Sequence, residues 1–458
     1  MSLTPRTEEM LSSGAAKASE ADAGTPADGI GTRRFVEWLK KLPKKIGLLA
    51  LSVVLTLAAL EGVFRLFGYR PLYDEYSKPD AFWVHDRTLG WALKPGSHGQ
   101  FVGPAPFPVE FRTDIRVNSF GFRGSEIKDV PAGGRRVVVL GDSQAAGFEV
   151  SERKTYEALL QDRLTSALGM PVQVINAGVR GYGTDQELLT YEKRLRQLHS
   201  DVVVLHFSAN DSDDDTTLHR TRRLFGKAAF ALRPDGSLRL VGAPVPNYSQ
   251  CSDYRLDDAY RVRRVDSFKD RSFCWIESHL TDRSALFSFV VARIRTNPTL
   301  LRWFHGLGTP GDEEAPVPAH TPTTRSSPAA SMPPGTTGAA PEPPTPASSP
   351  PGPGATDAAT VQGTDYRDVL TSTLILRLAS EVQQDGARFV MVAQDADLAG
   401  LDVGALERAG VNIARVDQAL GPDQSAIRFA NDGHFNARGH RAVAATLTRP
   451  LGYLLAAR

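Results

Sequence analysis

The sequence predicts an α/β fold with a mainly parallel β-sheet, from two kinds of observation. Short apolar segments such as Val137–Leu140 and Val202–Phe207 are typical of strands buried on both faces. Segments with helical spacing, such as Lys154–Leu168, separate them. Strands that alternate with helices form right-handed βαβ units. Polar, glycine-rich islands follow several of the strands, where open α/β sheets bind ligands.

Composition sets limits on the rest of the chain. The 53 basic and 52 acidic residues nearly cancel, so no basic excess indicates a nucleic-acid partner. Two cysteines, Cys251 and Cys274, rule out a disulfide scaffold and a Cys-rich zinc site. They would form a bridge in an oxidising compartment and remain thiols in the cytosol.

The N-terminal segment predicts a membrane anchor. Residues 1–32 have almost no large apolar side chains and are expected to form a disordered tail. Residues 33–70 contain a basic cluster followed by the uncharged run Ile46–Leu60. This segment predicts a basic flank and a single-pass signal-anchor helix. A buried core helix and a cleaved signal peptide are the alternatives. The basic flank predicts a cytoplasmic tail and an exported remainder.

Residues 71–134 consist of short alternating segments broken by Gly and Pro, which predict a small β-rich lead-in. Its turn-rich end, Asn118–Gly124, shows nothing obviously chemical.

The main domain is expected over residues 135–458. Residues 212–307 break the strand–helix rhythm as an insertion, with a hairpin over Phe230–Val241 and a helical pattern over Trp275–Arg295. Residues 308–363 are rich in Pro, Ala, Ser and Thr and predict a disordered loop. The other expected helices and strands are 172–177, 185–198, 366–384, 388–393, a short helix near 405, 411–416 and 437–451.

Four islands carry residues suited to ester chemistry. They are Gly141-Asp142-Ser143, the Gly-rich turn Asn176–Gly183, Ser208-Ala209-Asn210-Asp211 and Asp432-Gly433-His434. A serine nucleophile needs a base, a group that orients the base, and donors for the oxyanion. We assign these roles to Ser143, His434 and Asp432, with the backbone N–H groups of Ser143 and Gly181 and the Asn210 amide as donors. An extended segment would let Asp432 meet the ring two residues later.

Each island also has an ordinary structural explanation. Gly-Asp-Ser is a common helix cap, and Gly-rich turns and Asn-Asp caps are frequent. Asp211 and Asp213–Asp215 are also compatible with a solvated run or an adventitious cation site. His440 competes with His434 as the base.

These four motifs resemble the SGNH, or GDSL, hydrolase superfamily, whose blocks supply Ser, Gly, Asn and His in this order. The resemblance implies a flavodoxin-like three-layer α/β/α fold and the roles already given to Ser143, Gly181, Asn210, Asp432 and His434. The anchor segment and Asn118–Gly124 resemble membrane-anchored bacterial members, which implies a bacterial inner membrane with the domain on the extracytoplasmic side.

Two positions depart from the family pattern. Ser208 replaces the usual glycine before Asn210, and Gln144 replaces an apolar residue after the serine. Ala145 excludes the Gly-x-Ser-x-Gly elbow of α/β-hydrolases, and the lack of a following lysine excludes a phosphate-binding loop.

The sequence therefore predicts a membrane-anchored serine esterase that acts on short acyl or O-acetyl esters, with no cofactor and no metal. Its expected partners are a small ester or an acylated glycan and the membrane. An O-acyltransferase acting on envelope polysaccharide would use the same residues. A non-catalytic envelope scaffold is the alternative from another class.

Overall fold

The computed structural model describes residues 29–71, 81–104, 109–257, 261–297, 299, 365–421 and 423–457. The chain divides into two units, which meet between Val63 and Phe64. Residues 1–28 of the predicted tail lie outside the described residues. Helix α1 (Gly29–Leu66) begins within residues 29–32, the last part of that predicted tail. Within α1, Lys44–Leu66 is long and apolar enough to cross a membrane, with a mean hydropathy of 2.2.

The lead-in is β-rich, as predicted, and contains two antiparallel hairpins. One pairs β1 (Trp83–Asp86) with β2 (Gly90–Leu93). The other pairs β3 (His98–Gly103) with β4 (Phe111–Arg116). In β4 the side chains alternate between buried and exposed along the strand, so one face of this hairpin packs on the main domain.

The main domain contains a five-stranded parallel sheet of order β14-β13-β7-β5-β6. Its strands are β5 (Arg135–Gly141), β6 (Val172–Asn176), β7 (Val202–His206), β13 (Arg388–Ala393) and β14 (Asn412–Arg415). Counted along the chain, this is the 2-1-3-4-5 order of flavodoxin-like sheets, which confirms the predicted fold class. The order reverses between β5 and β7, so a ligand crevice is expected beyond the ends of these two strands.

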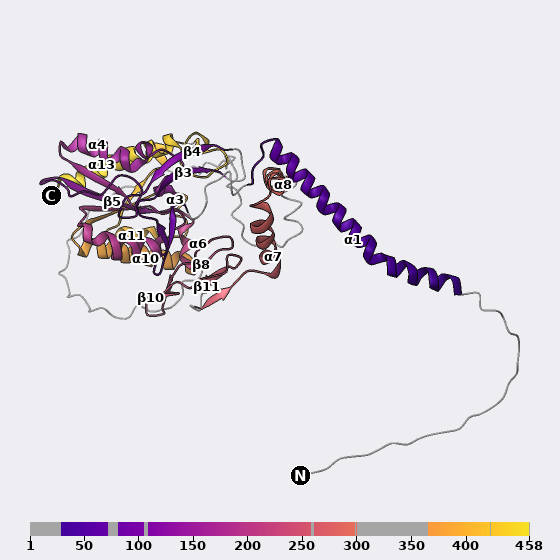
Figure 1. Cartoon of the computed structure of the whole chain (residues 1–458). Helices are drawn as coiled ribbons and strands as arrows, with labels where there is room; N and C mark the ends of the chain where they lie inside the picture. Colours follow the sequence, from indigo (N-terminus) through magenta and orange to yellow (C-terminus); the bar gives the residue numbers. More distant parts are fainter. Residues whose placement is uncertain are drawn as a thin grey trace, which may run out of the picture. The chain divides into compact units, whose positions relative to one another are not determined.

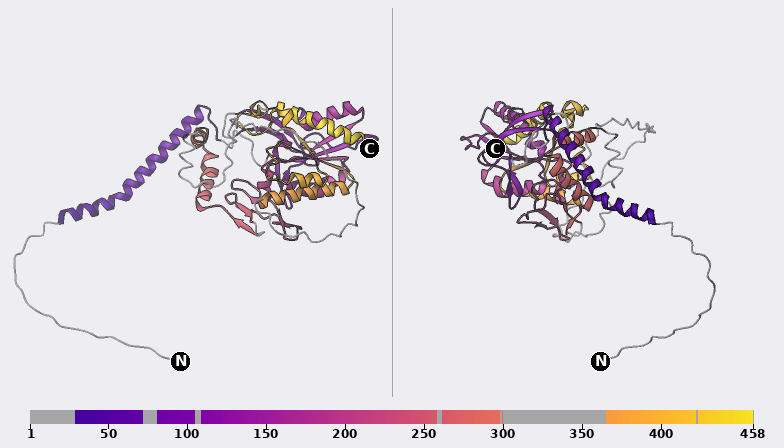
Figure 2. Two further views of the ribbon diagram at one scale, coloured as in Figure 1. Left: turned by 180° about the vertical axis from the view of Figure 1, so that it is seen from behind. Right: turned by 45° about the vertical axis from the view of Figure 1, so that its right-hand side comes forward.

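Helices cover both faces of the sheet (Figure 1, Figure 2). Val137 and Val139 of β5 face the core formed with α4 (Tyr156–Leu168) and α13 (Ala437–Ala456). Val138 and Leu140 face the opposite core, formed with helices α5 (Thr184–Thr190) and α10 (Tyr366–Gln384). Because successive strand residues point to opposite faces, a run of apolar residues such as 137–140 fits a sheet buried on both sides.

The remaining helices agree with the prediction in type, and some of them differ from it at their ends. Helix α10 (Tyr366–Gln384) has the predicted bounds, and α11 (Val403–Arg408) is the short helix expected near residue 405. The helix predicted over 185–198 is divided into three pieces: α5 (Thr184–Thr190), a π-helical turn (Tyr191–Leu195) and a 3-10 turn (Arg196–Leu198). Shorter pieces are the 3-10 turns Glu152–Lys154 and Gln424–Ala426 and the helices α3 (Ser143–Ala146), α6 (Asp211–Thr216) and α12 (Asp417–Leu420).

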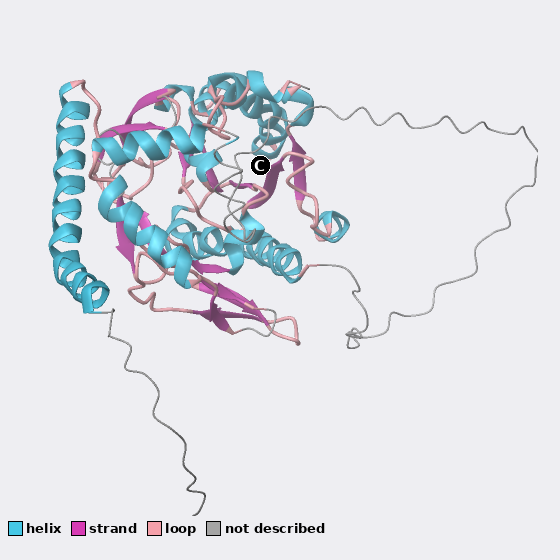
Figure 3. Cartoon of the chain, turned by 90° about the vertical axis from the view of Figure 1, so that its right-hand side faces the viewer, coloured by secondary structure: helices cyan, strands magenta, loops and turns pink. Residues whose placement is uncertain are grey.

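The insertion carries its own short strands and helices, which Figure 3 distinguishes by colour. The predicted hairpin is present as β9 (Ala229–Leu232) and β10 (Leu238–Val241). A second small sheet contains β8 (Thr217–His219), β11 (Tyr254–Leu256) and β12 (Val262–Arg264). The predicted 275–295 helix is instead α7 (Phe268–Ile276), a π-helical turn (Glu277–Thr281) and α8 (Ala285–Thr296).

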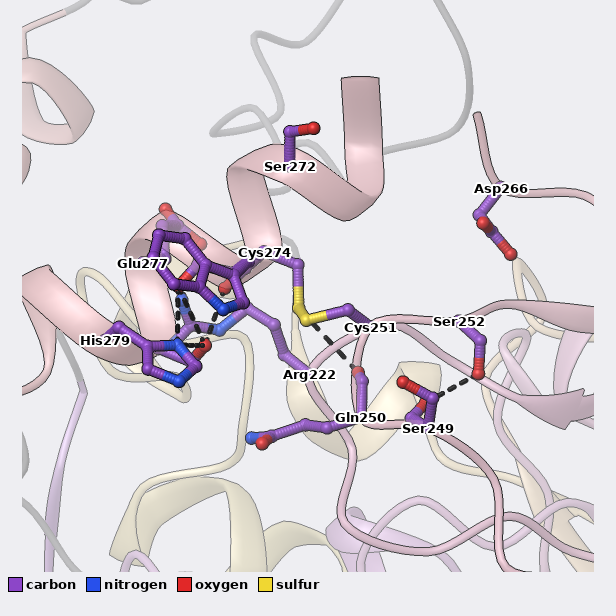
Figure 4. The surroundings of a disulfide bond; sticks show 12 residues. Arg222, Ser249, Gln250, Cys251, Ser252, Asp266, Ser272, Cys274, Glu277 and His279 are labelled. Carbon is purple, nitrogen blue, oxygen red and sulfur yellow. Dashed lines mark hydrogen bonds and ion pairs between the residues drawn. A yellow bond between two sulfur atoms is a disulfide. The ribbon is translucent and has the colours of Figure 1, made fainter. Parts of the chain in front are cut away.

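A disulfide joins Cys251 to Cys274 and so ties α7 to the loop before β11 (Figure 4). Sequence reasoning had left both the bridged and the reduced state open. The predicted disordered loop, residues 308–363, lies outside the described residues.

Candidate active site

The serine island forms a tight turn at the end of β5. Gly141 has a φ of +154°, and a Cβ atom there would lie 2.7 Å from the Ala145 Cβ and 3.0 Å from the His206 Cβ, so only glycine fits. Asp142 then caps the four-residue helix α3, and its carboxylate accepts the Gln144 backbone N–H at 2.8 Å. Ser143 is therefore held at the first position of α3, just beyond the carboxyl end of β5.

The Asp142 carboxylate connects the first and third islands. Its Oδ1 accepts the Ser208 hydroxyl at 3.2 Å. Its Oδ2 accepts the Asn210 amide at 3.3 Å and the Ser143 hydroxyl at 3.4 Å. Asn210 and Ser143 thus both donate to one carboxylate oxygen, so they lie close together. The Asn210 amide also donates to Asp214 Oδ2 at 3.0 Å, which fixes its orientation.

Ser208 fits the turn in which the family pattern has glycine. It is absent from the described non-glycine residues with positive φ, which are His199 and Arg222, so the position does not require glycine. Its backbone N–H donates to Asp211 Oδ2 at 2.9 Å, and its hydroxyl bonds Asp142. This departure therefore adds a hydrogen bond between the two islands and does not misplace Asn210.

The Gly-rich turn packs directly against α3. A Cβ atom on Gly178 would lie 2.5 Å from the Ala146 backbone nitrogen, so this glycine permits the close approach. Gly181 has a φ of +75°. The Trp91 indole N–H donates to Arg180 O at 3.2 Å, which is the carbonyl of the peptide bond that carries the Gly181 N–H. Strand β2 of the lead-in therefore fixes the plane of that peptide.

His434 meets Asp432 in a bend, whereas the sequence predicted an extended segment. The His434 backbone N–H donates to Asp432 Oδ1 at 2.9 Å, and the ring Nδ1 bonds the same oxygen. One carboxylate oxygen thus fixes both the backbone and the ring of His434. The Nε2 atom is left as the ring nitrogen able to accept a proton.

Gln144, the residue after the serine, joins the first island to the fourth. Its amide Nε2 donates to Gly433 O at 3.4 Å, and its Oε1 accepts the Phe435 N–H at 3.3 Å. These two hydrogen bonds lie on either side of His434 in the chain. The polar residue at this position thus brings the histidine segment next to Ser143, although Ser143 Oγ itself donates to Asp142 rather than to His434.

A second carboxylate faces His434. Glu149 has a fully buried side chain, and its Oε1 lies 3.6 Å from His434 Nδ1. The same oxygen forms an ion pair with Arg180. Because Arg180 precedes Gly181, this pair connects the surroundings of the histidine to the Gly-rich turn.

The charges around His434 and Asp432 shift the pKa values of both side chains. Burial lowers the pKa of His434, but the negative charges of Glu149 and Asp432 outweigh burial and the opposing charge of Arg180, and the pKa lies above its ordinary value. Burial raises the pKa of Asp432, but the hydrogen bonds and charge of His434 outweigh this and hold the pKa below its ordinary value. Asp432 is thus suited to remain ionised beside the ring.

His440, the competing histidine, lies away from Asp432. Its ring is buried, and Nδ1 accepts the Tyr156 backbone N–H at 3.2 Å. Burial, with the charges of Arg123, His206 and His434, lowers the pKa of His440 to about 3. It is a neutral core residue.

Sequence reasoning missed four residues that support the site: Trp91, Arg123, Glu149 and Arg180. Arg123 is buried, and its guanidinium donates to the carbonyl of Ala146 at the end of α3 and to those of Gly147 and Val150 after it. A charged residue inside an apolar or glycine-rich run is the signal that Arg123, Glu149 and Arg180 share. Trp91 offers no such local signal.

Donor atoms suited to a metal converge in one place among the described residues. One atom each from Glu149, Asp432 and His434 lies within 4.8 Å of the others. The Arg180 guanidinium is paired with Glu149 there, and a cation would compete with it. In the acidic run, Asp213 pairs with Arg367, Asp214 with Arg220, and Asp215 accepts the Thr371 hydroxyl. These partners account for Asp213–Asp215. Asp211 accepts the Ser208 N–H through Oδ2, and its buried Oδ1 has no hydrogen-bond partner among the described residues.

Residues 139–269 match the model of the GDSL-like Lipase/Acylhydrolase family, a range that includes Ser143, Gly181 and Asn210. This match supports the resemblance of the chain to the SGNH, or GDSL-type, hydrolase superfamily. An arylesterase from Vibrio mimicus is a curated relative, 36% identical over 76 residues. The aligned part is 17% of this chain and spans only 38% of the length of that relative.

Two solved structures are similar to this chain at low sequence identity. The crystal structure of TesA matches over 70% of this chain and 99% of that chain, with 10% identity and a TM-score of 0.33. A catalytic mutant of Axe2, an acetylxylan esterase from Geobacillus stearothermophilus, matches over 69% of this chain and 94% of that chain, with 10% identity and a TM-score of 0.31.

Proposed function

We propose that this protein is a serine esterase that hydrolyses short acyl or O-acetyl esters through an acyl-enzyme. The observation that carries the proposal is the convergence on the segment Asp142–Gln144. Asn210 and Ser143 share one oxygen of Asp142, and Gln144 holds the chain on both sides of His434. Residues far apart in the sequence thereby meet at one strand end.

In this mechanism Ser143 Oγ attacks the ester carbonyl while His434 Nε2 takes its proton. To reach Nε2, the hydroxyl leaves its hydrogen bond to Asp142, which at 3.4 Å is long. Asp432 stays ionised, orients the ring through Nδ1 and stabilises the imidazolium. His434 then gives the proton to the leaving alcohol, and an acyl group remains on Ser143.

The tetrahedral oxyanion needs preorganised donors. We assign this role to the backbone N–H groups of Ser143 and Gly181 and to the Asn210 amide. To donate to the oxyanion, the amide gives up its longer hydrogen bond, the one to Asp142 at 3.3 Å. Ser143 supplies its N–H from the first position of α3, and Trp91 fixes the Gly181 peptide through Arg180 O. Water then attacks the acyl-enzyme with His434 as base and releases the acid.

The decisive experiment uses the full-length chain in detergent. Ser143→Ala is expected to abolish both hydrolysis of p-nitrophenyl acetate and covalent labelling by a fluorophosphonate probe. Ser272→Ala, an exposed serine on α7, is the matched control and should label like the parent protein. Labelling that survives Ser143→Ala contradicts the proposal. Acyl transfer to an added glycan, with little free acid, favours the acyltransferase, and an inactive parent protein favours the scaffold.

We further propose that Lys44–Leu66 anchors the protein in a bacterial inner membrane as a single-pass helix. The domain boundaries predicted above, with a cytoplasmic tail before the helix and the lead-in and hydrolase domain after it, complete this proposal. The basic residues before the apolar run favour retention of the tail in the cytoplasm. The Cys251–Cys274 bridge is consistent with an oxidising compartment for the domain.

Protease added to intact spheroplasts tests this topology. Digestion of the domain, together with resistance of the membrane-bound protein to carbonate extraction, supports the anchor. A domain protected until the cells are lysed contradicts the exported orientation.

A further inference from the structure

Glu149 occupies an unusual place for a carboxylate. It follows α3 by three residues and lies between Phe148 and Val150, which are both buried. Its Oε1 contacts two groups at once, Arg180 and the His434 ring. Its Oε2 is buried with no hydrogen-bond partner among the described residues. Burying a charge in this way is costly, and a buried ion pair is by itself a poor source of stability.

The Glu149–Arg180 pair touches two parts of the proposed mechanism. On one side, Glu149 Oε1 lies 3.6 Å from His434 Nδ1, the nitrogen that Asp432 orients. On the other side, the Arg180 carbonyl accepts the Trp91 indole N–H and belongs to the peptide that carries the Gly181 N–H. Arg180 is therefore held at its side chain by Glu149 and at its backbone by Trp91.

We propose that Glu149 is a positioning residue for the reaction at Ser143, and that its ion pair with Arg180 joins the histidine base to the peptide that carries the Gly181 N–H. This inference rests on the proposed esterase function. It assigns a role to a segment that the serine, glycine, asparagine and histidine motifs do not include. Glu149 acts through His434 and Arg180 and does not need to contact the substrate.

The charged surroundings of His434 determine how the inference is tested. Asp432 lies on its own segment, Glu149 comes from the loop after α3, and Arg180 comes from the Gly-rich turn. Arg428 donates to Gly433 O. His440 and His206 are buried near the site. Burial is the largest cause that lowers their pKa values, to about 3 and about 4 respectively, so both rings are neutral near pH 7.

Glu149→Gln and Arg180→Gln should shift the pH profile in opposite directions. His434 acts as a base only when neutral, so kcat/KM falls as the pH drops below the pKa of His434. Glu149 raises this pKa and Arg180 lowers it. Glu149→Gln therefore moves the acid limb to lower pH, and Arg180→Gln moves it to higher pH. Each variant should also lower kcat by roughly 10- to 100-fold, because misplacing the reacting groups is costly, with little change in KM.

The double variant and a control complete this experiment. Glu149→Gln combined with Arg180→Gln removes both charges, so its acid limb should lie between those of the single variants. Glu152→Gln, three residues along the chain in an exposed pair with Arg116, should leave kcat and the pH profile unchanged. Acid limbs that stay in place, or that move in one direction in both single variants, overturn the inference even where activity falls.

A second measurement separates this inference from the proposed function. Histidine ring resonances in NMR report the titration of His434 directly, with His434→Gln to assign the signal. A parent protein that neither hydrolyses esters nor takes up the fluorophosphonate probe contradicts the esterase. An unchanged His434 titration in Glu149→Gln contradicts the role of Glu149, whatever the activity.

Discussion

The side chains assigned to chemistry and the side chains that hold them come from different parts of the fold. Ser143, Asn210 and Gly181 follow β5, β7 and β6, strands of one parallel sheet. Trp91 and Arg123 come from the lead-in, which the sequence presented as an ornament without chemistry. Glu149 and Arg180 lie within the loops of the sheet and pair with each other; Glu149 also contacts the His434 ring, and Arg180 O accepts the Trp91 indole N–H.

The difference between the strand-end residues and the supporting residues has a physical basis. The carboxyl ends of parallel strands meet at one edge of the sheet, so polar residues placed there converge without further information. The supporting residues act over long sequence separations, such as the 89 residues between Trp91 and Arg180. We expect changes among the strand-end residues to remove the chemistry and changes among the supporting residues to weaken it.

Among the substitutions that test this comparison, Asp432→Asn should lower kcat the most. An asparagine amide can donate to His434 Nδ1 and favour the tautomer with its proton on Nε2, which cannot accept the serine proton. We expect kcat to fall by roughly 10³- to 10⁴-fold, measured with p-nitrophenyl acetate. Asp423→Asn, an exposed aspartate nearby in the chain, is the control and should keep full activity. Loss of less than about tenfold would assign the orienting role to Glu149 instead.

Asn210→Ala should come next. It removes a donor that bonds both Asp142 and Asp214, and one oxyanion donor is worth roughly 10² to 10³ in kcat. KM should change little, because the oxyanion forms only after binding. Asn247→Ala on the exposed part of the insertion is the matched control. A large drop in melting temperature alongside the loss in kcat would show that Asn210 serves the fold rather than the oxyanion.

The sequence predicted the sheet well because its signals are local. Strand Arg388–Ala393 and helix Tyr366–Gln384 have the predicted bounds, since an uninterrupted apolar run and a regular helical spacing are each readable within the segment. The helix placed at 275–295 began too late, because the capping box of Ser267 and Asp270 that starts α7 was overlooked. It also continued through the break at 282–284, where Ser284 caps α8.

The sequence predicted which residue types form the candidate site, but it did not predict the hydrogen bonds that join them. Nothing local to Gln144 indicates that its amide bonds Gly433 and Phe435, nearly 300 residues away. Arg123 lies in a motif that was noticed as a turn, yet its contacts with the carbonyls after α3 depend on how the lead-in packs. Side-chain pairing between distant loops requires the tertiary structure, because many partners fit the same local pattern.

Trp91→Phe tests the support of the Gly181 peptide. The change removes the indole N–H that bonds Arg180 O and keeps an aromatic ring against Tyr182. One neutral hydrogen bond contributes about 1 kcal/mol, so kcat should fall by roughly 3- to 10-fold with KM nearly unchanged. Trp275→Phe, on the exposed surface of α7, is the control. A rise in KM alone would indicate that Trp91 contacts the substrate and does not hold the peptide.

Gln144→Met should have the smallest effect and the most specific one. Methionine keeps the length of the side chain but loses the hydrogen bonds to Gly433 O and from the Phe435 N–H, whose lengths of 3.4 and 3.3 Å mark both as weak. We expect a loss of roughly 2- to 5-fold in kcat and in the rate of fluorophosphonate labelling, since His434 would stay bonded to Asp432 and only its distance from Ser143 would vary more. Gln197→Met, an exposed glutamine, controls for the substitution itself. If labelling slows while the pH profile stays fixed, Gln144 holds the histidine segment in place; if the acid limb moves as well, the amide also contributes to the electrostatics of His434.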